Sequence, residues 1–94
     1  MEVVLTRDCL GGDRIVELQL PRGVALADLD RVEGVTSRTV LAELPRPFFR
    51  LDVPGAFLLT GIVGEPRVRF TVRLAARERA VELARETASR WLAP

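Results

Sequence analysis

The chain has 94 residues, a length that predicts one domain spanning residues 1–94. Its 14 cationic residues are all arginine, and 13 acidic residues leave a formal net charge of +1. Histidine, lysine and tyrosine are missing from the sequence, which excludes histidine-based catalytic relays, imidazole zinc sites, Schiff bases and Walker-type phosphate loops. The one cysteine excludes an internal disulfide and a multi-thiolate centre. We therefore expect no metal and no cofactor.

Hydrophobic residues make up 48% of the chain and charged residues 29%, which is typical of a folded globular protein. The first eight residues lack a basic segment, and the longest weakly polar run, residues 56–64, is too short to cross a membrane. We expect a cytoplasmic protein that does not contact membranes. The mean hydropathy of +0.16 is high for a domain this small, which predicts self-association, with a homodimer as the simplest form.

Four elements are predicted in the first half of the chain. Residues 3–6 form a short apolar run that suits an edge strand, and residues 14–20 alternate between apolar and polar side chains, as a half-buried strand does. Residues 25–33 predict a short helix, because apolar side chains recur every three residues and Gly34 follows where a helix would end. Residues 35–44 are rich in valine and threonine and predict another strand.

The second half predicts three strands and a long helix. Residues 48–53 and 67–74 alternate between apolar and polar side chains, and the second of these is the clearest strand pattern in the chain. Residues 56–63 are apolar on both faces, so we expect this strand to be covered on both sides. Residues 75–92 contain good helix formers, no glycine and no proline. The apolar stripe of this helix is Ala80, Val81, Ala84, Ala88, Trp91 and Leu92.

These elements predict an α+β fold with a mainly antiparallel sheet of five to six strands. The short helix and the long amphipathic helix can cover one face of the sheet only, which leaves the other face to solvent or to a second copy. The strand–helix–strand stretch over residues 14–44 is also compatible with a ferredoxin-like variant. The three strands that follow without a second helix depart from that pattern.

Arginines are concentrated around the last predicted strand. Between residues 67 and 79 there are five arginines and one acid, a local charge of +4. Because guanidinium groups match phosphates, this arginine ladder predicts an anion site. Its members are Arg67, Arg69, Arg73 and Arg77. The alternative is that acids on neighbouring strands, or on a second copy, pair with these arginines. The candidates on neighbouring strands are Glu17, Glu43 and Asp52.

Apolar side chains on the strands at 48–53 and 56–63 are the candidates for an interface between copies. We expect them to be Phe48, Phe57, Leu59 and Ile62. Phe48 is expected to point outward beside arginines, which is a composition typical of protein interfaces.

Three weaker features have structural interpretations. Residues 61–64 match the four-residue GxxG string of RNA-binding KH domains, but their strand-like surroundings favour a bulge or a close-packed sheet position followed by a turn. Cys9 lies between two acids in a predicted hairpin connection, where a thiol is not activated. The acids of the short-helix region are expected to form a solvated polar face. They are Asp28, Asp30 and Glu33.

The sequence thus favours a small non-enzymatic binding and assembly module that self-associates through its sheet and can present a surface to a protein partner. The first alternative is an anion or nucleic-acid-backbone binder that uses the arginine ladder, although the balanced charge does not favour nucleic acid. The second alternative is a small enzyme that uses carboxylates or Cys9, for which no catalytic constellation stands out.

Overall fold

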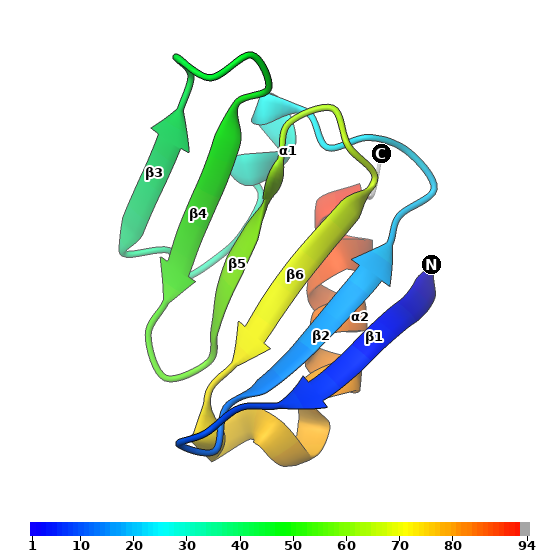
Figure 1. The fold of residues 1–94 in the computed structure, drawn as a ribbon, viewed down its shortest axis with the longest axis vertical. Coiled ribbons are helices and arrows are strands. Elements are labelled where there is room, and N and C mark those ends of the chain that lie inside the picture. Colours follow the sequence, from blue (N-terminus) through cyan, green and yellow to red (C-terminus); the bar gives the residue numbers. More distant parts are fainter. Residues whose placement is uncertain (93–94) are drawn as a thin grey trace.

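The computed structural model describes residues 1–92 and consists of one six-stranded antiparallel sheet with its helices on one side (Figure 1). The strands are β1 (Glu2–Asp8), β2 (Arg14–Gln19), β3 (Ser37–Leu41), β4 (Phe48–Val53), β5 (Phe57–Ile62) and β6 (Arg67–Val72). The helices are α1 (Leu26–Leu29), the 3₁₀ helix η1 (Leu74–Arg79) and α2 (Ala80–Leu92). The predicted α+β class and the antiparallel sheet are confirmed.

The strand order across the sheet is β1-β2-β6-β5-β4-β3. The β1–β2 hairpin forms one edge, and β3 to β6 form a meander whose last strand returns to pair with β2 (Figure 1). Both helices lie behind the sheet in this view, with α2 against β2. The order of elements, ββαββββα, differs from the βαββαβ order of ferredoxin-like folds, so that variant is not confirmed.

The core lies between the sheet and α2. The stripe predicted for the long helix is buried at Ala80, Ala84, Ala88 and Trp91, and small alanines let the helix approach the sheet closely. Phe70 on the central strand β6 contacts Trp91 of α2, with ring centroids 6.5 Å apart. The sheet contributes Val16, Leu18, Phe49, Leu51, Phe57, Leu59, Val68, Phe70 and Val72. None of the described helices has the length and apolar run that a membrane crossing requires.

Both predicted helices differ from expectation in detail. α1 spans Leu26–Leu29 instead of 25–33, because the chain after it forms tight turns with bonds to the third preceding residue, such as Val32 N–H to the Leu29 carbonyl. The long helix begins as η1, since tertiary contacts bind its start to the β1–β2 hairpin. The Leu74 N–H donates to an Asp13 carboxylate oxygen at 3.0 Å, and Arg77 donates to the Gly12 carbonyl at 3.4 Å.

Two glycines occupy positions where a side chain does not fit. A Cβ at Gly61 would lie 2.7 Å from Cζ of the buried Phe49 ring, which confirms a close-packed sheet position within the GxxG string. A Cβ at Gly23 would lie 2.3 Å from the Gly64 carbonyl oxygen. The segment after β2 is bonded there to the β5–β6 turn, because the Gly64 N–H donates to the Val24 carbonyl at 2.8 Å.

We predict that Gly23→Ala lowers the free energy of unfolding by about 1–3 kcal/mol, because the added methyl group meets backbone atoms that cannot rotate away. Urea unfolding followed by circular dichroism measures the change. Ser89→Ala on the exposed side of α2 is the control and should stay within about 0.5 kcal/mol of the wild type. Equal stability of Gly23→Ala and the wild type would contradict the close approach of the two loops.

Candidate binding surfaces

The sheet face turned away from the helices, which we call the open face, is the first candidate surface. The cross-strand pair Phe48 and Ile62 lies on it, as predicted, with Phe48 half-buried and Ile62 36% exposed. Leu58 is half-buried on the same face, and Ile15 of β2 is buried there by its neighbours. The open face therefore carries apolar side chains that no helix covers.

The structure corrects the other two predicted interface residues. Phe57 and Leu59 are only 4% and 0% exposed, because both point to the helix side of β5 and belong to the core. The apolar run over residues 56–63 is explained by alternation, since the core takes Phe57 and Leu59 and the open face takes Leu58 and Ile62. An interface on the open face cannot include Phe57 or Leu59.

A shallow hollow of about 470 Å³ lies on the open face beside the apolar pair. Thr60 and the arginines of β6 line it together with Phe48 and Ile62. Arg46 and Glu65 form an ion pair at its rim. The hollow combines apolar side chains with charged ones, as the centre and rim of protein interfaces do.

Most of the arginine ladder is neutralised within the chain. Arg69 pairs with Glu17 across β6 and β2 at 3.6 Å, and Arg77 lies 3.6 Å from Asp8. Arg73 bridges two carboxylates, those of Asp13 at 3.3 Å and Asp52 at 3.8 Å. These contacts confirm the predicted pairing for Glu17 and Asp52. Arg67 alone among the four ladder arginines forms no ion pair within the described chain.

The prediction that Asp28 belongs to a solvated polar face is wrong, because its side chain is buried and hydrogen-bonded. Its side chain accepts hydrogen bonds from both terminal nitrogens of Arg22, at 2.6 and 2.9 Å, and from the Ala25 N–H at 2.8 Å. The residue is only 4% exposed. The hydrogen bonds from Arg22, aided by the Ala25 N–H, hold the pKa of Asp28 below its ordinary value against the opposing effect of burial. The carboxylate therefore acts as the cap of α1.

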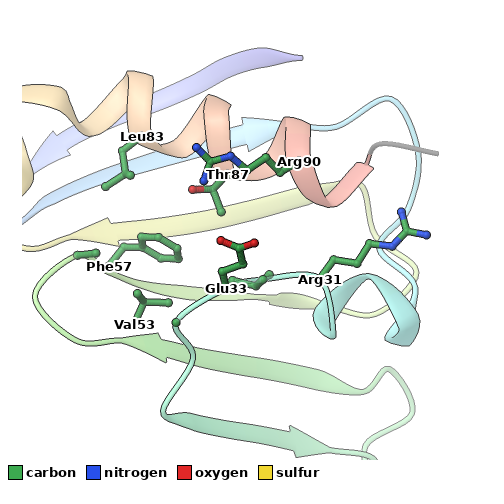
Figure 2. A pocket seen from close by; sticks show the side chains of 10 residues that line it. Arg31, Glu33, Val53, Phe57, Leu83, Thr87 and Arg90 are labelled. Carbon is green, nitrogen blue, oxygen red and sulfur yellow. The ribbon is translucent and has the colours of Figure 1, made fainter.

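The second candidate is a cleft of about 690 Å³ on the opposite, helix-bearing side (Figure 2). It opens between α2, the segment after α1 and the ends of β4 and β5. Its apolar lining consists of Val53 and Phe57, which form the floor on the sheet side, and of Leu83 on the α2 wall. Phe57 contacts Phe70 in an edge-to-face arrangement with centroids 5.2 Å apart, so the floor is continuous with the core.

Charged and polar groups stand on both walls of this cleft. Figure 2 shows the Glu33 carboxylate pointing from the segment after α1 toward the α2 wall, which carries Thr87 and Arg90. Arg31 points away and donates to the Trp91 carbonyl at 3.2 Å, which joins the two walls. Sequence analysis did not find this cleft, because its residues come from three distant segments and share no local motif.

Cys9 lies in the turn of the β1–β2 hairpin and is half-buried. Its N–H donates to the Asp13 carbonyl at 2.8 Å, which closes the turn. Among the described residues, no three acidic or thiol side chains gather as metal ligands would.

Comparisons with protein-family models, with curated proteins and with solved structures found no match to this chain. The geometry and charges of the two surfaces are therefore the basis for inferring a function.

We predict that Asp28→Asn lowers the free energy of unfolding at pH 7 by about 1–3 kcal/mol, since a buried charge-assisted network loses its anion. The pKa of Asp28 is lower in the folded chain than in the unfolded chain. Its stabilising effect is therefore complete above the ordinary aspartate pKa of about 3.9 and is lost as the pH falls through the folded-state pKa. Urea unfolding between pH 2 and 7 should show a smaller loss in the variant than in the wild type, because the variant keeps the contribution of Asp8 and loses that of Asp28.

The control for this experiment is Asp30→Asn, which removes a mostly exposed partner of Arg38. We expect a change of less than about 1 kcal/mol, as for other surface ion pairs. If the two variants had the same free energy of unfolding at every pH, the Asp28 carboxylate would not stabilise the start of α1 more than a surface ion pair does.

Proposed function

We propose that the protein is a non-enzymatic binding and assembly module that associates with a second copy through its open face. The observation that carries this proposal is the position of the helices: all of them lie on one side of the sheet, and Phe48, Leu58 and Ile62 remain on the other. A contact between two copies would remove these side chains from water, and burial of apolar surface is the main driving force of association.

The charges of the open face are compatible with a second copy. Arg69 and Arg73 are neutralised by acids of their own chain, whereas Arg50 and Arg67 on the same face form no ion pair among residues 1–92, so the contact would have to leave these two arginines at its rim in water. A two-fold contact places the same patch of both copies together, and the hollow beside Phe48 offers space for side chains of the second copy.

The same ion pairs do not favour the anion-binding alternative, because a paired arginine is less available to a phosphate group. A strand of nucleic acid is held by several phosphate contacts and by stacked aromatic side chains. Of the predicted ladder, Arg67 alone stands on the open face without an ion pair among residues 1–92, and Phe48 is the one aromatic side chain in the hollow.

An enzymatic role has no specific support in the geometry. Hydrogen bonds from Arg14 and Arg22 lower the pKa values of the Asp8 and Asp28 carboxyls. A lowered pKa suits a permanent ion pair, whereas a general acid at neutral pH needs a raised one.

We predict that light scattering on the purified protein gives the mass of a dimer at micromolar concentrations. Ile62→Asp should weaken dimerisation about tenfold or more, because it places a charge in the centre of the contact without disturbing the core. Leu10→Asp is the matched control, since Leu10 is fully exposed in the β1–β2 hairpin, and it should leave the dimer intact.

The same measurement at increasing salt, with and without a short single-stranded oligonucleotide, separates the alternatives. A dimer that persists at high salt supports the apolar contact. If the wild type is a monomer at all concentrations, the proposal is overturned and the protein acts as a single copy. If the protein forms a complex with the oligonucleotide that dissociates at high salt, the proposal is overturned in favour of the anion binder.

A further inference from the structure

We propose that the cleft between α2 and the segment after α1 binds a small zwitterion with an apolar body, such as an α-amino acid with a large apolar side chain. The site lies on the helix-bearing side of the sheet and does not depend on assembly through the open face.

The size and floor of the cleft suit a small organic ligand. Its volume of about 690 Å³ falls within the range of ligand pockets, about 300–1,000 Å³. The floor is apolar at Val53 and Phe57, Leu83 adds an apolar side chain on the α2 wall, and the Phe57 ring contacts Phe70 of the core. An apolar side chain placed on this floor would leave water without requiring the core to rearrange, because the cleft already exists without a ligand.

Three charged residues line the cleft, and of these Arg31 is bonded to the Trp91 carbonyl while Glu33 and Arg90 stand on opposite walls. Glu33 and Arg90 come from different elements and both line the cleft, yet neither forms an ion pair within residues 1–92. Most other charged groups around the sheet do find partners, including the ladder arginines Arg69, Arg73 and Arg77. The cleft therefore carries a carboxylate and a guanidinium cation that form no ion pair with other residues of the described chain.

A zwitterion can form an ion pair with Glu33 and with Arg90 at the same time. Its carboxylate can form a two-pronged contact with the Arg90 guanidinium, which is the strongest common pairing of a carboxylate in proteins. Its ammonium group can bind the Glu33 carboxylate, and the Thr87 hydroxyl on the α2 wall can accept a further hydrogen bond from it. Glu33 and Arg90 are both exposed, so a ligand with one charge only would use one of them and leave the other in water, with a weaker contact than a zwitterion makes.

The two walls of the cleft are joined by a hydrogen bond from Arg31, a lining residue whose side chain points away from Glu33 and Arg90. Arg31 donates to the Trp91 carbonyl at 3.2 Å and so connects the segment that carries Glu33 to the end of α2. Binding can thus use a largely preformed site.

The test is a titration of the isotope-labelled protein with phenylalanine and leucine, followed by amide chemical shifts. We expect saturable shifts at residues around the cleft with a Kd on the order of 1 mM or tighter. N-acetyl-phenylalanine lacks the ammonium group and phenylalanine amide lacks the carboxylate, so both should bind at least about tenfold more weakly. Glycine lacks the apolar body and should show no saturation.

Two variants assign the charges. Glu33→Gln should weaken phenylalanine binding about tenfold or more while leaving N-acetyl-phenylalanine unchanged, and Arg90→Gln should do the same with phenylalanine amide as the unchanged ligand. Arg85→Gln, on an exposed part of α2 that does not line the cleft, is the control and should bind like the wild type. Circular dichroism confirms that each variant is folded.

The proposal is overturned if phenylalanine and leucine produce no saturable shifts at 10 mM, about ten times the expected Kd. It is also overturned if Glu33→Gln and Arg90→Gln bind as tightly as the wild type, or if the shifted residues lie on the open face. Because the readout is local, a failure of assembly through the open face does not affect these outcomes.

Discussion

The pairing of β6 with β2 is the constraint on which the rest of the molecule depends. It joins the N-terminal hairpin to the meander and makes β6 a central strand, so that Phe70 lies beneath Trp91 and α2 is drawn over this part of the sheet. A single 13-residue helix cannot also cover β4 and β5, and the short α1 covers only part of that area. Both candidate surfaces follow from this pairing, because one is the uncovered side of the sheet and the other is the space that α2 leaves open on its own side.

The same pairing decides what the arginines do. Glu17 stands opposite Arg69 only because β2 and β6 are neighbours in this register, and Arg73 reaches Asp13 only because the β1–β2 turn lies beside the end of β6. A one-residue shift in register would turn Glu17 to the helix side and leave Arg69 unpaired. The register of the sheet thus pairs three of the four ladder arginines, Arg69, Arg73 and Arg77, with acids of the same chain.

Alternation and helix propensity were sufficient to predict the elements and much of the core. Val68, Phe70 and Val72 are buried as their spacing indicates, and so are the alanines and Trp91 of the long helix. The errors occur where tertiary contacts outweigh local pattern. Residues 74–79 have the composition of an α-helix, yet hydrogen bonds to Asp13 and Gly12 hold them as a 3₁₀ turn. Asp28 was predicted to be solvated because the arginine that pairs with it precedes the helix and lies outside its periodic pattern.

The run of apolar residues in β5 shows why surface assignment needs the partner elements. Phe57, Leu58 and Leu59 are similarly apolar in sequence, but the first and third pack under the helices while the second faces the open side. Phe57 also forms the floor of the cleft, so one residue contributes both to the core and to a candidate site. Its edge-to-face contact with Phe70 restricts the ring, and a restricted apolar floor loses little side-chain entropy when a ligand covers it. If the cleft binds a ligand as proposed, the order of the core thus reduces the entropic cost of that binding, whereas burial of Leu58 and Ile62 on the opposite side depends on the proposed second copy.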